Sequence, residues 1–149
     1  MYVQTLMGKK GFDVFSVSAN DTVQHVLQLF STKKIGFAVV GKVPENIIGT
    51  VSERDICHAL SDSGGAETST PIQAVMTKEI FFCDTKDTLT KVMATMTGRR
   101  TRHMLVKDGD NFVGVISIGD VVKYRLDESL RDEDDLRKYI QGTGYNYAG

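Results

Sequence analysis

The sequence predicts a mixed α+β fold in which two copies of a β-α-β-β-α unit are related by a pseudo-twofold axis, with small sheets packed on helices. The first observation is an internal repeat, because residues 14–40 align with residues 80–106 at a constant spacing of 66 positions. The second is that each copy alternates β-prone runs with stretches of helical periodicity. The third is composition: 149 residues, 41% of them hydrophobic, suffice for a compact domain with its own core. The unit is too long for a solenoid and too few in number for a propeller.

A short apolar helical turn is expected before each copy, because one apolar pattern occurs twice at a spacing of 69 positions. The segment 8–11, Gly-Lys-Lys-Gly, follows the first turn and is predicted to be a basic, flexible loop. The matched residues are Val3, Leu6 and Met7 in the first turn and Ile72, Val75 and Met76 in the second.

An amphipathic helix is expected in each copy, because apolar residues recur at i, i+3, i+4 and i+7 from Val23 and from Leu89. Asp21-Thr22 and Asp87-Thr88 supply candidate N-caps for these helices. One strand precedes each helix and two follow it, the last two joined by a polar turn. The expected strands are 14–17, 37–40 and 47–51 in the first copy, and 80–83, 103–106 and 112–116 in the second.

A second helix closes each copy, and the one in the second copy is predicted to run from near Ser117 to about Gln141. The acidic middle of this helix, residues 132–135, predicts a solvated or partly docked extension. The segment 61–70 is rich in Ser, Gly and Thr, which is typical of a linker. The expected divisions are a first repeat with lead-in and linker at 1–70, a second repeat with the extended helix at 71–141, and a flexible tail at 142–149.

Charge and residue types narrow the function classes. A formal net charge of -1 argues against nucleic acid or an anionic membrane as the main partner. Cys57 and Cys83 lie in apolar stretches without metal-ligand spacing, so both are expected to be buried free thiols. His25 and His58 also lack a partner at metal-ligand spacing, so no metal site is predicted. With no membrane-length apolar run and no signal-peptide core, a cytoplasmic protein is expected.

The segment Gly-x-(Val/Ile)-Ser-x-x-Asp occurs at the same strand-to-helix junction in both copies, at 49–55 and 114–120. One interpretation is structural, because Ser and Asp at this spacing before an apolar run form a capping box. The other is a nucleoside phosphate site: a helix N-terminus favours phosphate, and a carboxylate one turn in can accept both ribose hydroxyls. Arg54 adds a cation whose fork matches phosphate oxygens, whereas the second copy has Ile118-Gly119 in place of Glu53-Arg54. The two sites are therefore expected to differ.

The two motifs, the duplicated element order and the string Arg-His-Met-Leu-Val at 102–106 resemble a tandem pair of cystathionine β-synthase (CBS) domains, a Bateman module. Residues 114–123 are similar to the second repeat of small stand-alone bacterial CBS-pair proteins. The resemblance implies a non-catalytic regulatory module that binds an adenine nucleotide, such as AMP, ADP, ATP or NAD, in clefts between the repeats. It also implies a homodimer and no catalytic cofactor, and leaves any regulated protein unidentified.

The resemblance further implies roles for individual residues. Asp55 and Asp120 would bind ribose hydroxyls, and Ser52 and Ser117 would contact ribose or phosphate. The basic pair at 102–103 is expected near phosphate, although a solvated arginine and a capping or core histidine explain these residue types equally well. The expected nucleotide-binding residues are Gly36, Phe37, Ala38, Ser52, Arg54, Asp55, Lys78, Ile80, Arg102, His103, Met104, Leu105, Ser117 and Asp120.

Other functions are weighed against this sensor. A scaffold with empty pockets, whose helices mediate assembly, is the main alternative, and the intact Ser and Asp of both motifs favour the sensor. An independent enzyme is disfavoured because neither cysteine sits in a nucleophile context with a base partner. A basic patch at 9–10 and 99–102 could bind nucleic acid, but the acidic stretch 127–135 opposes this. Lys33, Lys34, Arg99 and Arg100 are interpreted as solvated charges at helix ends.

Overall fold

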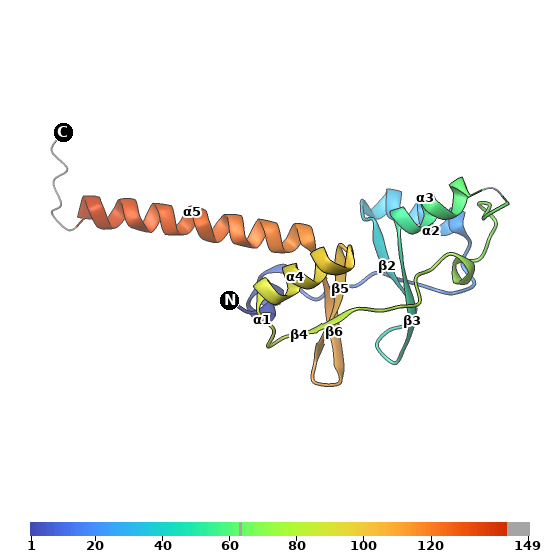
Figure 1. Cartoon of the computed structure of the whole chain (residues 1–149), viewed down its shortest axis with the longest axis horizontal. Helices are drawn as coiled ribbons and strands as arrows, with labels where there is room; N and C mark the ends of the chain where they lie inside the picture. The colour runs from blue at the N-terminus through green and yellow to red at the C-terminus, as the bar shows by residue number, and fades with distance from the viewer. Residues whose placement is uncertain (63, 143–149) are drawn as a thin grey trace.

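The computed structural model describes residues 1–62 and 64–142, and it consists of two similar halves (Figure 1). Seven of the eight tail residues, 143–149, lie outside the described residues, so the predicted flexible tail is not addressed. The first half contains α1 (Val3–Lys10), β1 (Ser16–Val17), α2 (Val23–Lys33), β2 (Phe37–Lys42), β3 (Asn46–Ser52) and α3 (Glu53–Ser61). The second contains η1 (Ile72–Ala74), β4 (Phe82–Asp84), α4 (Leu89–Arg99), β5 (His103–Asp108), β6 (Asn111–Ser117) and α5 (Ile118–Gly142).

Each half has a three-stranded sheet, with strand orders β1-β2-β3 and β4-β5-β6. The first strand of each sheet pairs parallel to the middle strand, which pairs antiparallel with the third. The register is the same in both sheets: Ser52 lies opposite Phe37, and Ser117 lies opposite His103. The predicted β-α-β-β-α unit is therefore confirmed in both copies. The first strands are shorter than expected and start two residues later, at Ser16 and Phe82.

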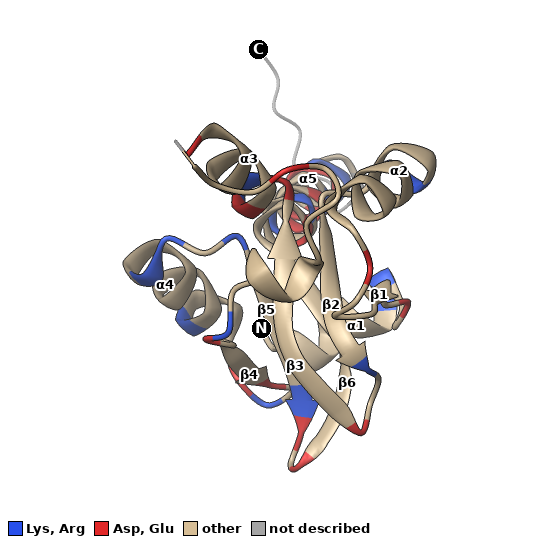
Figure 2. Ribbon diagram, turned by 90° about the vertical axis from the view of Figure 1, so that its right-hand side faces the viewer, with Lys and Arg blue, Asp and Glu red and all other residues tan. Residues whose placement is uncertain are grey.

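Helices α2 and α4 are capped at both ends in the same way. The hydroxyl of Thr22 accepts a hydrogen bond from the amide of His25, and that of Thr88 accepts one from the amide of Lys91. Each helix is followed by a residue with a left-handed backbone conformation, Lys34 after α2 and Arg100 after α4. In Figure 2 the strands lie in the middle of the molecule, and α2, α3 and α4 lie around them.

The two lead-in turns are exchanged between the halves. Residues from α1 pack in the core of the second half, whereas Ile72 of η1 packs in the core of the first. Matched backbone hydrogen bonds hold both turns: the amide of Val3 donates to the carbonyl of Asp87 at 2.9 Å, and that of Ile72 donates to Asp21 at 2.7 Å. Each half therefore completes its core with a segment that precedes the other half in the chain. The α1 residues concerned are Val3, Leu6 and Met7.

A third apolar cluster joins the two halves across the pseudo-twofold axis. Val39 of β2 packs with Leu105 of β5 and Val115 of β6, and all three are buried. Phe37, Ile80 and other partly buried residues pack against this cluster. The two sheets thus meet through side chains on alternate positions of their strands, while the intervening residues face the helices of their own half.

Helix α5 continues well beyond the second half, and Figure 1 shows it projecting from the body as a single rod. Leu126, Leu130 and Leu136 are each more than half exposed along it. Ion pairs one helical turn apart, Glu133 with Arg137 at 3.0 Å and Asp134 with Lys138 at 3.1 Å, support the projecting part. The predicted solvated extension is therefore present. Within the described residues, no helix is both long and apolar enough to cross a membrane.

Two expectations about single segments are wrong. The lysines predicted to lie in a flexible loop at 8–11 are the last turn of α1, because Lys10 is anchored to the second half. Cys57 is an exposed thiol on α3, because the helix turns this position away from the core that Ile56 enters. Cys83 is buried as expected, and burial, together with the nearby carboxylates of Asp87 and Asp84, raises its pKa to about 12.

Candidate functional site

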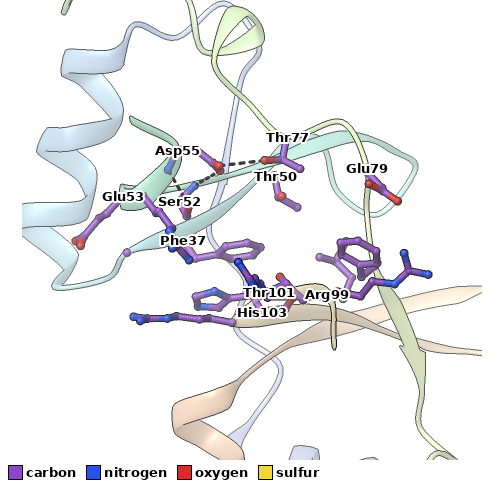
Figure 3. Close-up of a pocket in the computed structure, with 16 residues that line it drawn as sticks. Phe37, Thr50, Ser52, Glu53, Asp55, Thr77, Glu79, Arg99, Thr101 and His103 are labelled. Atoms are coloured by element: carbon purple, nitrogen blue, oxygen red, sulfur yellow. Dashed lines mark hydrogen bonds between the residues drawn. The ribbon is translucent and has the colours of Figure 1, made fainter. Parts of the chain in front are cut away.

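Both motif copies form the helix start that the structural interpretation predicts. In the first, the amide of Asp55 donates to Ser52 Oγ at 3.1 Å, and the amide of Ser52 donates to Asp55 Oδ2 at 2.9 Å. In the second, Ser117 and Asp120 make the same two bonds at 3.0 and 2.9 Å. The capping box uses one oxygen of each carboxylate. The remaining oxygen of Asp55, Oδ1, accepts a hydrogen bond from Thr77 Oγ1 at 3.1 Å (Figure 3).

A cleft of about 620 Å³ lies between the two halves and opens beside the first motif. This volume is within the range of sites for small molecules and cofactors. One wall comes from the first half: the start of β2, the end of β3 and the N-terminus of α3. The other comes from the segment before β4, the α4–β5 loop and the start of β5. The lining residues are Gly36, Phe37, Thr50, Ser52, Glu53, Arg54, Asp55, Thr77, Glu79, Phe81, Arg99, Arg100, Thr101, Arg102, His103 and Leu105.

The cleft is rich in charge, and most of its positive charge comes from the second half. Three of its four arginines come from the second half, at the end of α4 and in the loop that follows. The N-terminus of α3 lies on the wall from the first half, with the positive end of its helix dipole and with Asp55. Arg99 is held over the ring of Phe81, with its guanidinium carbon 5.6 Å from the ring centre. In Figure 2 the loop that follows α4 has blue segments, which mark Lys and Arg, and it lies near α3.

Two aromatic rings at equivalent repeat positions stack between the halves. The rings of Phe37 and His103 are 4.1 Å apart and nearly parallel, at 9°. Burial, and next the positive charge of Lys10, lower the pKa of His103 to about 4, so the imidazole is neutral at physiological pH. Neutral His103 therefore contributes ring surface and no positive charge to the cleft, and the arginines carry its cationic character.

A paired β-α-β-β-α fold with a charged cleft between the halves agrees with the comparison with known families. The family described as "CBS domain" matches residues 3–62 and residues 72–127, which together make up most of the chain. The chain belongs to the CBS domain family. It contains two CBS domains in tandem, as the sequence resemblance indicated.

Known proteins similar to this CBS pair include both plant and bacterial members. A mitochondrial CBS domain-containing protein of Arabidopsis thaliana is 30% identical over 132 residues, which is 86% of this chain but 64% of that protein. The chain thus spans less than two thirds of this relative. The solved structure of a CBS-domain protein from Agrobacterium tumefaciens is 34% identical, with a TM-score of 0.79, and the match covers 84% of this chain and 99% of that one.

Two more distant CBS structures contain adenine compounds. A CBS domain protein from Pyrobaculum aerophilum, 23% identical with a TM-score of 0.67, is complexed with AMP. That match covers 80% of this chain and 89% of the other. A CBS pair at 14% identity and a TM-score of 0.72 is complexed with 5′-methylthioadenosine and S-adenosylmethionine, with 86% of this chain and 98% of the other covered. At these identities the likeness concerns the fold of the CBS pair alone.

The cleft of the CBS pair brings together eight of the fourteen residues expected to bind nucleotide. The other six lie elsewhere: Lys78 and Ile80 are one residue out of phase with the lining positions of their segment, and Ser117 and Asp120 belong to the second motif. Ala38 and Met104 are buried in the cores of their own halves. The eight lining residues are Gly36, Phe37, Ser52, Arg54, Asp55, Arg102, His103 and Leu105.

Four of these six residues, Ala38, Lys78, Ile80 and Met104, lie outside the cleft because side chains alternate along an extended chain. On β2, Phe37 faces the cleft, whereas Ala38 points into the helical layer of its own half. The segment before β4 is also extended, so its lining positions are two apart. A three-residue run taken from either segment therefore includes a residue that faces away. The lining positions before β4 are Thr77, Glu79 and Phe81.

Arg99 and Arg100, interpreted as solvated charges at a helix end, are exposed at the end of α4, and both also line the cleft. The left-handed conformation of Arg100 at the end of α4 turns the chain back toward the first half. The equivalent positions in the first copy, Lys33 and Lys34, are not among the residues lining this cleft. A run of arginines at 99–102 in only one copy is the sequence signal that could have suggested this asymmetry.

Proposed function

We propose that this CBS pair is a regulatory module that binds an adenine nucleotide, such as AMP, ADP, ATP or NAD, in the cleft beside the first motif. The observation that carries the proposal is the position of Asp55. Its Oδ1 atom faces the cleft with one hydroxyl donor, Thr77, already bound to it. A ribose brings two hydroxyls, which can replace or join that donor. A carboxylate that accepts hydroxyl donors fits a ribose better than it fits an anion.

The rest of the cleft suits the other two parts of a nucleotide. Phosphate groups are favoured by the positive end of the α3 helix dipole and by the guanidinium groups of Arg54 and Arg102. Phe37, Phe81 and Leu105 provide apolar surface for a base. The adenine compounds in the two distant CBS structures support this class of ligand. The proposal includes no catalytic step and no catalytic cofactor.

A regulatory role requires that the ligand bind two arrangements of the protein with different affinity. The cleft spans both repeats, so a nucleotide that contacts Asp55 and the arginines of the second repeat would restrain the angle between them. We propose that this restraint is passed to a regulated protein. The alternative is a CBS scaffold whose cleft is empty and whose helices mediate assembly.

A nucleotide panel tests the proposal directly. Thermal unfolding is measured with AMP, ADP, ATP, NAD, NADH and S-adenosylmethionine, for the natural chain and for Asp55→Ala. A compound at about 100 times its dissociation constant adds roughly 2.7 kcal/mol to the free energy of unfolding, which raises the melting temperature by several degrees. We expect the shift for at least one adenine nucleotide in the natural chain and its loss in Asp55→Ala.

The duplicated motif provides the matched control for this experiment. Asp120→Ala removes the equivalent capping carboxylate from the second motif, so each variant loses one capping box, worth about 1 kcal/mol without ligand. Asp55→Ala also loses the hydrogen bond from Thr77, and Asp120→Ala also loses the ion pair with Lys10. Asp120→Ala is expected to keep the nucleotide shift. If no adenine compound stabilises the natural chain, the scaffold takes the place of the sensor. If the shift survives in Asp55→Ala, the site assignment is wrong.

We also propose that the chain forms a homodimer, as its family resemblance implies. Light scattering coupled to size exclusion is expected to give twice the mass of one chain, with and without nucleotide. A mass equal to one chain over the micromolar range would contradict this prediction.

A further inference from the structure

Lys10, at the end of α1, occupies the second motif. Its Nζ atom donates to the carbonyl oxygen of Val115 at 2.6 Å and forms an ion pair with Asp120 Oδ2 at 2.5 Å. Both side chains of the pair are only about a quarter exposed, at 27% and 28%. Although burial acts to raise it, the hydrogen bonds from Lys10 and from the amide of Ser117 lower the pKa of Asp120.

In the first repeat, the carbonyl and the carboxylate that correspond to the two partners of Lys10 are bound by neutral groups. Thr50, which corresponds to Val115, pairs with Thr77 through two backbone hydrogen bonds of 2.8 and 2.9 Å. The hydroxyl of Thr77 then reaches Asp55. In each repeat, therefore, the lead-in of the other repeat binds both the strand carbonyl and the motif carboxylate. In the first repeat the amide of Thr77 binds the strand carbonyl and its hydroxyl binds the carboxylate. In the second repeat the ammonium group of Lys10 binds both.

This difference determines whether a ribose can reach the carboxylate. A ribose hydroxyl can replace Thr77 on Asp55 by exchanging one neutral donor for another. On Asp120, Lys10 binds the same oxygen, Oδ2, that accepts from the amide of Ser117. A ribose that displaces this ammonium group must break a charge-assisted bond, which is roughly twice as strong, and leave a partly buried charge without its partner. The second motif also lacks an arginine next to its aspartate, where Gly119 stands, so a phosphate there gains less.

The rest of α1 holds Lys10 in this position. The methyl group of Met7 lies so close to Gly114 of β6 that a Cβ there would be 2.6 Å from it. Lys9 Nζ lies 4.9 Å from the ring centre of Tyr124 on α5, a cation–π contact that fastens the same end of the helix. Lys10 is thus fixed at the second motif by α1 packing and is not a mobile surface lysine.

We infer that Lys10 is an internal plug of the second motif, so that each chain binds one nucleotide, in the cleft beside Asp55, and none beside Asp120. The inference rests on the proposed nucleotide-binding function of the first cleft. Lys10 holds the Asp120 carboxylate in an ion pair at Oδ2, and removing its ammonium group makes this carboxylate available to a ribose.

Binding stoichiometry tests the plug, with AMP and ATP as the probes in isothermal titration calorimetry. The natural chain is expected to bind one nucleotide, and Lys10→Met, which keeps the apolar stem without the charge, is expected to bind two. Lys33→Met removes an exposed lysine that does not line the cleft and is expected to stay at one. The double variant Lys10→Met/Asp120→Ala is expected to return to one, and Lys10→Met/Asp55→Ala to retain one at the second motif.

The outcomes separate the plug from the proposed function. Two nucleotides per natural chain would overturn the plug and leave the first site in place. One nucleotide on the natural chain and also on Lys10→Met, with unchanged circular dichroism, would do the same. No binding by the natural chain but one nucleotide on Lys10→Met would overturn the proposed function and support the plug. If neither chain binds either probe, both proposals are wrong.

Discussion

Leu105→Ala is expected to destabilise the chain by about 2–5 kcal/mol, the range for truncating a fully buried leucine. Leu105 is 1% exposed and packs with Val39 and Val115, the cluster that joins the two repeats. It also lines the cleft, so the cavity left by the missing methyl groups opens beside the proposed ligand. Urea denaturation measures the loss of stability, and the nucleotide-induced shift is expected to decrease together with it.

A matched control for this prediction lies on α5. Leu126 is 57% exposed, so Leu126→Ala is expected to change the free energy of unfolding by less than about 0.5 kcal/mol. If the two variants lose the same amount of stability, the contact between the repeats contributes little. In that case the cleft would not depend on Leu105 for its shape.

The repeated parts of the fold could be predicted from the sequence because their signals are local. The spacing of apolar residues located α2 and α4, and Thr22 and Thr88 marked their starts. The capping-box spacing placed Ser52 and Asp55 at a helix start. Each of these features depends on residues within a few positions of one another, and the repeat then showed that both halves have one topology.

The parts that could not be predicted depend on contacts between distant segments. Nothing in the local pattern of Val3, Leu6 and Met7 indicates that α1 completes the core of the second repeat. The side of a strand that faces the cleft is likewise decided by which neighbour covers the other side. The alternation of Thr77, Glu79 and Phe81 becomes visible only when the cleft is known.

Lys10 was predicted to be part of a flexible loop, although the sequence contains a signal for its position. At the spacing that relates the two lead-in turns, Lys10 corresponds to Glu79. Glu79 lies in the cleft beside the first motif, so Lys10 is expected near the second by the same pseudo-symmetry. The exchange of the lead-ins had to be known before this correspondence could be used, because it decides which motif each lead-in approaches.

Acid is expected to weaken the fold through His103, and His103→Phe should remove this part of the pH dependence. The ordinary histidine pKa is 6.5 and that of folded His103 is about 4. Between these values the unfolded chain binds a proton that the folded chain does not, so stability falls as the pH decreases. A shift of this size corresponds to a loss of about 2–3 kcal/mol between pH 7 and pH 4.5.

Phenylalanine is the appropriate replacement because the repeat already has Phe37 at the equivalent position, stacked against His103. The variant keeps an aromatic ring between the repeats and removes only the titrating group. Carboxylates with lowered pKa values, such as Asp84 and Asp87, also stabilise the fold less in acid, but this loss is the same in the natural chain and in His103→Phe. We therefore expect urea denaturation at pH 7 and pH 4.5 to show a smaller loss in His103→Phe than in the natural chain. Equal losses would mean that His103 takes up a proton in the folded state, and that the contact between the repeats is more hydrated than the stacked rings indicate.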